Sequence, residues 1–200
     1  MIELDKSALI GKGLHRECFV HPDNAARCIK IVVSGTIDEN RREASYYGML
    51  ARRGISWEML TRFHGLVDTN LGEGAIFDLV RDHDSRVSHT LEHYLESEAL
   101  TAAHGPVLSQ ALRDLKNYLL QNRVVTMTIK PKNILFQRAT ANTGKLVIID
   151  NVGNSDFIPL ANYSAALARR KILRKWYRFQ QSMAADYSSN KALASALAHM

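Results

Sequence analysis

The chain has 200 residues, of which 46% are hydrophobic and 23% are charged, a balance typical of a globular protein rather than a disordered one. No apolar run approaches the roughly 20 residues that cross a bilayer, and the N-terminus lacks the apolar core of a signal peptide. We therefore expect a cytoplasmic protein without a membrane partner, in which Cys18 and Cys28 are free thiols. The net charge of +6 favours anionic partners such as nucleotides or nucleic acids.

The first 80 residues predict a β-rich lobe with one helix. Short apolar stretches and tight turns over the first 35 residues predict a twisted antiparallel sheet. Apolar and tyrosine side chains at three- and four-residue spacing predict a helix over 37–53. Two further strands are expected at 63–69 and 74–80.

The rest of the chain, 81–200, predicts a mostly helical lobe. Amphipathic patterns indicate helices over 88–100 and 106–123. Apolar runs on either side of a turn-rich loop at 138–144 predict a β-hairpin. A basic helical tail follows from about residue 160. The order of elements predicts a single α+β domain with two lobes.

Three residues of the first lobe fit a phosphate site. Gly11 and Gly13 lie between two predicted strands, where glycine lets backbone N–H groups approach a phosphate, although a tight turn is the commoner meaning of such a pair. Lys30 lies between two isoleucines on a strand, so its side chain points to the opposite face. Taken alone it is an exposed charge, but beneath the glycine turn it would contact the α- and β-phosphates.

A glutamate in the following helix could hold that lysine by an ion pair. Glu43 is the favoured partner, although Glu39 remains open and Glu43 could be an exposed helix charge.

A metal site is indicated in the second lobe. Asn133 and Asp150 lie at the two ends of the predicted hairpin, where hard oxygen ligands could converge on magnesium. Lys130 and Lys132 could stabilise phosphate charge beside them. Asparagine and aspartate each occur often in turns, but their order after the glycines and Lys30 favours a nucleotide–magnesium site.

These motifs resemble those of protein kinases. TIKPKNILF resembles the kinase catalytic loop, and IIDNVG resembles a variant of the DFG segment. More narrowly, GKGLHRECFVHPDNAARCIKIV, VVTMTIKPKNIL and DNVGNSDFIPLA resemble the YrbL family of PhoP-regulated bacterial proteins over nearly the whole chain.

The kinase resemblance implies a bilobal fold that binds ATP and Mg²⁺ between its lobes. It implies that Gly11 and Gly13 cover the phosphates, that Glu43 holds Lys30, and that Asn133 and Asp150 bind the metal. It also implies a hinge near adenine at 78–80, with Asp78 and Val80 at its ends, and catalytic roles for Lys130 and Asp150. The phosphoryl acceptor, a protein or a small molecule, is not indicated by the sequence.

The departures from the kinase pattern bear on catalysis. Arg16 replaces the third glycine of the phosphate loop, and Thr128 stands where kinases carry the aspartate that accepts the substrate's proton. Asn151 and Val152 replace the phenylalanine of DFG, with one residue added. A threonine cannot act as a carboxylate base, so both a weak or atypical phosphotransferase and a regulatory pseudokinase remain open.

Two other hypotheses come from short patterns. His89, Glu92 and His93 match HxxEH, a zinc-protease motif that often arises by chance on a polar helix face. The segment 169–178 holds six basic residues beside Trp176 and Tyr177, which fits a nucleic acid or an acidic partner, although such runs are usually solvated helix faces.

Overall fold

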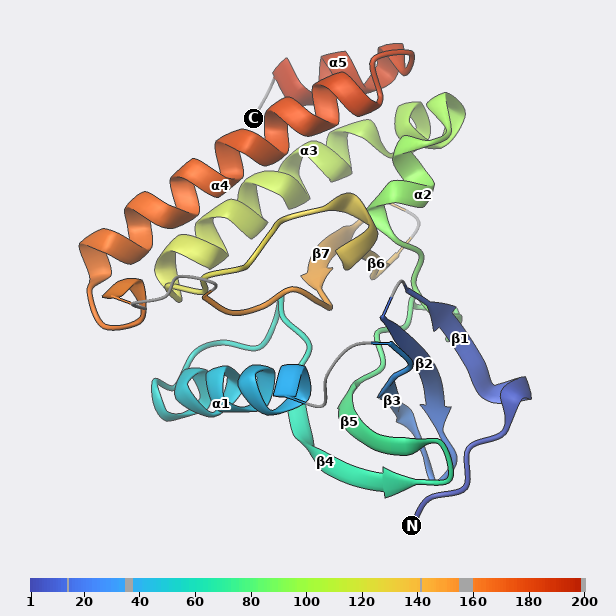
Figure 1. Ribbon diagram of the computed structural model, residues 1–200. Coiled ribbons are helices and arrows are strands. Elements are labelled where there is room, and N and C mark those ends of the chain that lie inside the picture. The colour runs from blue at the N-terminus through green and yellow to red at the C-terminus, as the bar shows by residue number, and fades with distance from the viewer. Residues whose placement is uncertain (14, 35–37, 141, 155–159, 199–200) are drawn as a thin grey trace. The chain divides into compact units, whose positions relative to one another are not determined.

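The computed structural model describes residues 1–13, 15–34, 38–140, 142–154 and 160–198. The chain forms two compact units, one of residues 1–57 and 61–80 and the other of residues 58–60 and 81–200. The expected mixed α+β class is confirmed by an antiparallel sheet and several helices (Figure 1). Within the described ranges, no helix combines the length and the apolarity that a bilayer crossing demands.

The first unit contains a five-stranded antiparallel sheet in the order β1-β2-β3-β5-β4, with one helix, α1. Its elements are the 3₁₀ turn η1 (Lys6–Ala8), β1 (Leu9–Lys12), β2 (Arg16–His21), β3 (Asn24–Val32), α1 (Asp38–Arg52), β4 (Phe63–Thr69) and β5 (Gly72–Asp78). The predicted helix and strands are confirmed, although β5 begins two residues early, inside the expected turn. The start of the predicted helix, residue 37, lies outside the described residues.

Side chains along β3 point alternately to the two faces of this sheet. Ile29 and Ile31 are buried on one face, where they pack with Leu4 and Phe19. Gly74 of β5 makes this packing possible, because a Cβ at that position would lie 2.5 Å from Cγ2 of Ile29. The opposite face of β3 carries polar and thiol side chains and is described with the candidate site.

The second unit is mostly helical with one β-hairpin, as predicted. Its elements are α2 (Leu91–Leu95), α3 (Glu98–Gln121), η2 (Pro131–Asn133), β6 (Ile134–Arg138), β7 (Gly144–Ile148), η3 (Leu160–Asn162), α4 (Ala165–Asp186) and α5 (Lys191–Ala198). Strands β6 and β7 pair antiparallel, which confirms the hairpin. Helix α3 packs against β7, α4 and α5 (Figure 1).

Three helix boundaries differ from the prediction. The pattern over 88–100 forms short α2 and then the start of α3, because Ser97 caps α3 by accepting a hydrogen bond from the Leu100 amide at 3.3 Å. Helix α3 continues through Pro106, which was expected to start it. Proline costs a helix one backbone hydrogen bond, and here the Ser109 hydroxyl donates to the Gly105 carbonyl nearby. The tail forms two helices, because α4 ends at Asp186.

The buried face of α3 agrees with the predicted amphipathic stripe. Its buried apolar members are Leu108, Ala111, Leu112, Leu115, Tyr118 and Leu119. Helix α4 contributes its own stripe, which includes Ile172, Trp176, Phe179 and Met183. Trp176 is therefore a core residue, whereas its neighbour Tyr177 is 61% exposed.

Candidate functional site

The first unit places the predicted phosphate residues on one face of its sheet. Gly11 pairs with Cys18, Cys18 with Lys30, and Lys30 with Ala75, so these four residues form a row across β1, β2, β3 and β5. Directly opposed residues of an antiparallel sheet point to the same side. The glycine strand and Lys30 are therefore joined on one face, with the Cys18 thiol between them.

Gly11 lies in β1 and Gly13 in the turn that follows, and neither position requires a glycine. The amide of Gly13 donates to the Arg16 carbonyl at 2.8 Å, which closes the turn. Neither glycine has a positive φ. A Cβ on Gly11 would lie 3.8 Å from Cβ of Cys18, an ordinary contact, and one on Gly13 would lie 3.4 Å from the Arg16 oxygen. The fold itself therefore leaves room for a side chain at Gly11, whereas a phosphate bound close to this backbone would leave none.

Lys30 is a buried cation. Its residue is 7% exposed, and its ammonium lies 4.5 Å above the ring centroid of Phe77. The negative face of an aromatic ring attracts a cation, more strongly where water is excluded. The alternative of an exposed strand lysine is thus wrong.

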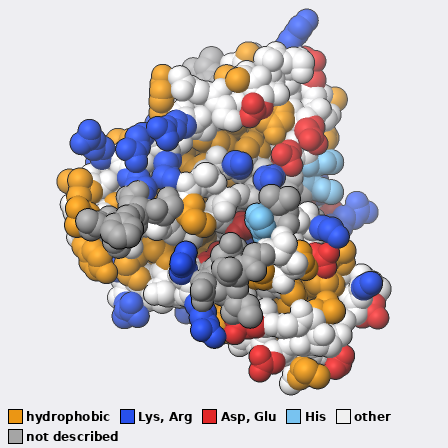
Figure 2. All heavy atoms as spheres, viewed as in Figure 1, with side chains coloured by type: hydrophobic (Ala, Val, Ile, Leu, Met, Phe, Trp, Pro, Cys, Tyr) orange, Lys and Arg blue, Asp and Glu red, His pale blue; other side chains and the backbone are white. Residues whose placement is uncertain are grey.

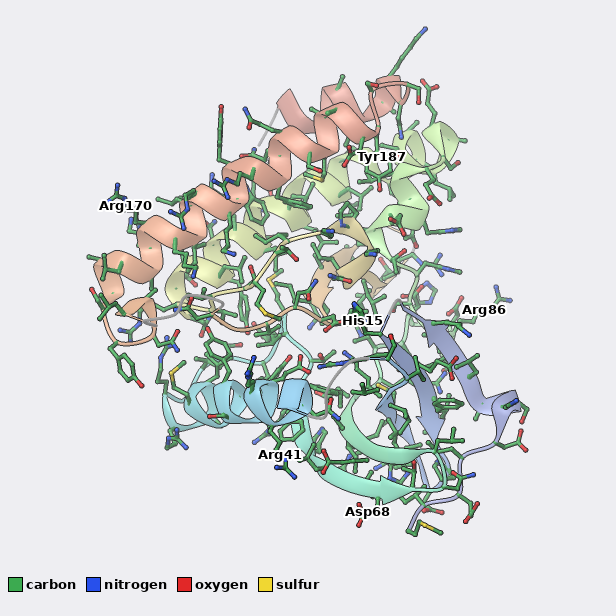
Figure 3. All side chains as sticks on the ribbon, viewed as in Figure 1. His15, Arg41, Asp68, Arg86, Arg170 and Tyr187 are labelled. Atoms are coloured by element: carbon green, nitrogen blue, oxygen red, sulfur yellow. The ribbon has the colours of Figure 1, made fainter. Side chains whose placement is uncertain are left out.

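Glu43 is also buried, at 8% exposed, so the alternative of an exposed helix charge is wrong. Its carboxylate accepts a hydrogen bond from the Arg16 guanidinium at 2.5 Å, and this ion pair is mostly shielded from water. Arg41 on the same helix is exposed, and Figure 3 shows it extending away from α1. Of Glu39, only the backbone is described. Sequence reasoning treated Arg16 only as a lost glycine and missed this pair.

The predicted hinge residues lie at the end of β5. The Asp78 carboxylate accepts from the Arg62 amide at 3.0 Å and contacts the His64 ring nitrogen at 2.6 Å, on the face opposite Phe77. Val80 is buried and is the last residue of the first unit.

The two thiols share the Lys30 face. Both are free, as predicted. Cys18 is partly exposed, whereas Cys28 is buried. A hydrogen bond with Cys18, followed by burial, raises the pKa of the Cys28 thiol, which therefore stays protonated and weakly nucleophilic.

The second unit gathers the remaining predicted residues around one small pocket. It is lined by Thr126, Thr128, Ile129, Lys130, Asn133, Ile134, Ile148 and Asp150. Lys130, Asn133 and Asp150 are thus brought together, beside the threonine that departs from the kinase pattern. Lys132 is exposed and does not line the pocket.

Backbone hydrogen bonds connect the two ends of the hairpin at this pocket. The Ile149 amide donates to the Asn133 carbonyl, and the Asn133 amide donates to the Lys130 carbonyl, each at 3.0 Å. In the described part of the chain, the Asn133 side-chain nitrogen is buried without a hydrogen-bond partner. Buried polar groups normally have partners, so this amide fits a site that takes a ligand. The carboxylate of Asp150 and the amide oxygen of Asn133 are suitable magnesium ligands.

The segment after Asp150 pairs with the segment around Thr128. The Met127 amide donates to the Asn151 carbonyl at 2.7 Å, and the Asn151 side-chain amide donates to the Thr128 hydroxyl at 3.0 Å. Asn151 has φ of +60°, a conformation that asparagine tolerates better than most residues. The two departures from the kinase pattern are therefore in contact with each other.

Helix α4 supports both of these segments through lysines that sequence reasoning placed on a basic surface. The Lys175 ammonium donates to the Met127 carbonyl, and the Lys171 ammonium donates to the Asn154 side-chain oxygen. Lys171 is 5% exposed. Their positions flank the buried stripe of α4, which is the signal that could have distinguished them from the exposed arginines.

The HxxEH histidines do not form a metal pair. His89 precedes Thr90, the N-cap of α2, so it does not lie one helical turn from His93. Their rings stack with centroids 4.2 Å apart and planes 20° from parallel. Imidazole lone pairs lie in the ring plane, so stacked rings direct them side by side rather than onto one ion. Among the described residues, no cluster of three or more His, Cys, Asp or Glu side chains is arranged to hold a metal.

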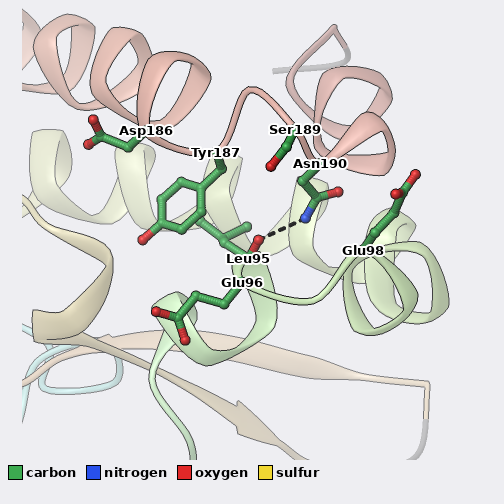
Figure 4. A pocket seen from close by; sticks show the side chains of 7 residues that line it. All are labelled: Leu95, Glu96, Glu98, Asp186, Tyr187, Ser189 and Asn190. Atoms are coloured by element: carbon green, nitrogen blue, oxygen red, sulfur yellow. Dashed lines mark hydrogen bonds between the residues drawn. The ribbon is translucent and has the colours of Figure 1, made fainter.

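Another cavity lies elsewhere in the second unit, at the α2–α3 and α4–α5 junctions (Figure 4). It measures about 420 Å³ and is lined by Leu95, Glu96, Glu98, Asp186, Tyr187, Ser189 and Asn190. The Asn190 amide donates to the Leu95 carbonyl and to the Thr101 hydroxyl, each at 2.8 Å, so it ties the two junctions together. Burial, together with nearby carboxylates, raises the pKa of Tyr187 to about 12. This cavity is a structural junction and holds none of the predicted site residues.

The fold and these two groups of residues define a mixed α+β protein with a glycine–cysteine–lysine row on the sheet of one unit and a carboxylate–amide pocket in the other. The model of the family described as PhoP regulatory network protein YrbL matches residues 2–184. The chain is 42% identical over 182 residues to proteins described as uncharacterized protein YrbL from Escherichia coli strain K12 and from Shigella flexneri. In each case the match covers 90% of this chain and 86% of the relative. The protein belongs to the YrbL family.

Proposed function

We propose that this protein binds a nucleoside triphosphate with magnesium through a protein-kinase-like fold. The observation that carries the proposal is the pocket of the second unit, where Lys130, Asn133 and Asp150 lie together although the sequence separates them. In the first unit, the row from Gly11 to Lys30 offers backbone amides and an ammonium for phosphates. ATP and Mg²⁺ are the favoured cofactors.

Thr128 bears on phosphoryl transfer rather than on nucleotide binding. It lines the pocket at the position that the kinase resemblance assigns to the proton-accepting aspartate, and its hydroxyl already accepts a hydrogen bond from Asn151. A hydroxyl cannot take up a proton at neutral pH as a carboxylate does. We therefore favour a regulatory nucleotide-binding protein in which transfer to a protein or small-molecule acceptor is slow or absent.

The test is isothermal titration of the protein with ATP in the presence and absence of Mg²⁺, with ADP release measured in parallel. Magnesium-dependent binding without appreciable ADP release is expected. Asp150→Asn should lose the magnesium dependence of ATP binding. The matched control is Asp84→Asn, which changes an exposed carboxylate of the same unit outside the pocket. Absence of ATP binding by the unaltered protein would contradict the proposal.

Thiol labelling gives a second measurement on the first unit. Cys18 is partly exposed between Gly11 and Lys30, whereas Cys28 is buried. Bound ATP should slow alkylation of Cys18 by iodoacetamide. Equal labelling with and without saturating ATP would exclude a nucleotide on this face.

A second candidate function rests on the outer face of α4. Figure 2 shows Lys and Arg side chains gathered over this helix. The exposed members of the run are Arg169, Arg170, Arg174 and Arg178, and Arg170 extends away from the helix in Figure 3. Tyr177, also exposed, lies among them, with its hydroxyl accepting a hydrogen bond from Gln181 at 2.7 Å. Arginines with an exposed aromatic ring fit a single-stranded nucleic acid, and an acidic protein is the alternative partner.

This candidate is tested by binding to single-stranded DNA at increasing salt. Replacing Arg170 with glutamate should weaken salt-sensitive binding, whereas Lys116→Glu on α3, which changes the net charge by the same amount, is the charge-matched control. Binding that is equal in both variants would exclude the α4 face.

A further inference from the structure

Both cysteines of the chain lie on the same face of the first sheet. Cys18 on β2 pairs with Lys30 on β3. Cys28 pairs with Val20, two residues along β2 from Cys18, so the cysteines occupy diagonal positions on neighbouring strands. Residues two apart on a strand point to the same side, which places both thiols on the face that carries Lys30. A side-chain hydrogen bond joins Cys18 and Cys28, so their sulfur atoms are in contact.

The two thiols differ in their access to solvent. Cys18 is partly exposed, whereas Cys28 is only 4% exposed. A reagent in solution therefore meets Cys18 first, and Cys28 lies within reach of whatever bonds to the Cys18 sulfur. Lys30, directly opposite Cys18, supplies a positive charge that favours the thiolate, which is the nucleophilic form. An accessible thiol beside a second thiol is the arrangement typical of cysteines that are reversibly oxidised.

Reaction at Cys18 makes Cys28 more reactive. In the reduced protein the pKa of the Cys28 thiol is raised first by its hydrogen bond with Cys18, then by burial and by the charge of Cys18. The charge of Lys30 acts in the opposite direction and lowers this pKa, and the charge of Asp78 adds to the increase. A disulfide-bonded Cys18 carries neither a charge nor a thiolate that could accept the hydrogen bond. Both effects of Cys18 then disappear, so the pKa of Cys28 falls and its thiolate forms more readily.

We propose that Cys18 and Cys28 form a reversible thiol-modification site that reacts with low-molecular-weight disulfides. The Cys18 thiolate attacks one sulfur of the reagent, whose S–S bond breaks and releases a thiolate that takes up the proton lost by Cys18. The Cys28 thiolate then attacks the Cys18 sulfur, and the second half of the reagent leaves and takes up the Cys28 proton. The protein loses two electrons and two protons, which reduce the reagent to two thiols. This site goes beyond the proposed function, since its chemistry requires no nucleotide.

The diagonal placement favours a reversible bond over a structural one. Cα atoms of diagonal neighbours lie about 7–8 Å apart, whereas those of a disulfide usually lie within about 6.8 Å. Closing the bond therefore requires β2 and β3 to shift by about 1 Å. Of the two strands β2 is the less restrained, because its other neighbour is the short edge strand β1. A disulfide under strain is more readily reduced, which suits a reversible modification.

The experiment is intact-mass spectrometry of the reduced full chain after incubation with oxidised glutathione, with the remaining thiols trapped by N-ethylmaleimide. The unaltered protein should lose the two thiol hydrogens and carry neither glutathione nor N-ethylmaleimide. Treatment with dithiothreitol should restore both thiols. Persistent glutathione on the unaltered protein, or a disulfide-linked dimer, would overturn the intramolecular bond. An unaltered protein that keeps both thiols reduced overturns the whole proposal.

Two matched variants test the order of the steps. Cys28→Ala should retain one glutathione as a stable mixed disulfide at Cys18, because no second thiol is present to release it. Cys18→Ala should take up no glutathione over the same time, because Cys28 is buried. Equal reaction of the two variants overturns the assignment of Cys18 as the attacking thiol. Alanine is chosen because a buried cysteine behaves as a small apolar residue, and the result for the unaltered protein stands even if Cys28→Ala does not fold.

Discussion

The side-chain amide of Asn151 donates a hydrogen bond to the Thr128 hydroxyl across 3.0 Å. Each residue departs from the kinase pattern, one in the DFG-like segment and the other at the position of the proton-accepting aspartate. Through this contact the Thr128 hydroxyl has a hydrogen-bond partner at the pocket of the second unit, although residue 128 carries no carboxylate. Introducing a carboxylate there is therefore the most direct test of whether residue 128 limits the proposed phosphoryl transfer.

Replacement of Thr128 with aspartate should increase nucleotide turnover. The introduced carboxylate could accept the same Asn151 N–H and also take up a proton from an acceptor hydroxyl or water, and a general base contributes about 10²-fold or more. ADP formation from ATP and Mg²⁺ is the measurement. Thr128→Asn, of similar size but uncharged, is the control, and equal rates for the two variants would contradict this account.

Substitution of Gly11 with alanine should affect ligand binding more than stability. The added Cβ would lie 3.8 Å from Cβ of Cys18, so the fold accommodates it, whereas a phosphate close to the backbone would not. We expect an unchanged denaturation midpoint and weaker ATP binding. Gly74→Ala is the opposite case, because its Cβ would lie 2.5 Å from Ile29, and overpacking of this kind costs about 1–3 kcal/mol. If Gly11→Ala instead lowers the midpoint as much as Gly74→Ala, the glycine is structural.

Removal of the Lys175 ammonium should loosen the backbone beside Thr128. Lys175 donates to the Met127 carbonyl, and the Met127 amide is itself bonded to the Asn151 carbonyl. Lys175→Met should therefore increase hydrogen exchange at the amides of Met127 and Gly153. Arg174→Met, at the adjacent exposed position, is the matched control. Equal protection of these amides in both variants would show that α4 does not support the pocket.

Acid should destabilise the second unit through its partly buried histidines. Burial lowers the pKa of His104, and the charge of Arg138 lowers it further, while the ring packs against Tyr94 and Phe136. A lowered pKa means that the folded state binds fewer protons than the unfolded state. The stability contributed by the neutral ring is complete above the ordinary pKa of about 6.5 and is lost as the pH falls through and below that value.

Urea midpoints measured between pH 7.5 and pH 5 test this dependence. His104→Leu should reduce the loss of stability on acidification, and His89, whose pKa burial also lowers, accounts for part of the remainder. His83→Gln, an exposed histidine of the same unit, controls for the loss of one imidazole. An identical pH profile in His104→Leu and the unaltered protein would refute the prediction.

Local sequence patterns determined most of the elements of this fold. Strong periodicity predicted α1 and the buried stripe of α3, and turn residues between apolar runs predicted the β6–β7 hairpin, because local propensity and burial agree there. The break between α2 and α3 was missed. Ser97 caps α3, but the surrounding packing decides whether such a residue interrupts a helical pattern, and the sequence pattern does not show that packing. The order of Lys130, Asn133 and Asp150 indicated a common site, and the pocket that they line depends on hydrogen bonds between the two ends of the hairpin.

The sequence by itself determined that residue 128 is a threonine, where the resemblance to kinases implies a carboxylate base. Tertiary structure alone decided what replaces it, because the bond from Asn151 joins residues separated by 23 positions in the chain. The same holds for Glu43, whose partner was decided by strand register and helix packing. These bring Arg16 to its carboxylate, and no spacing rule in the sequence encodes a contact between a strand and a helix.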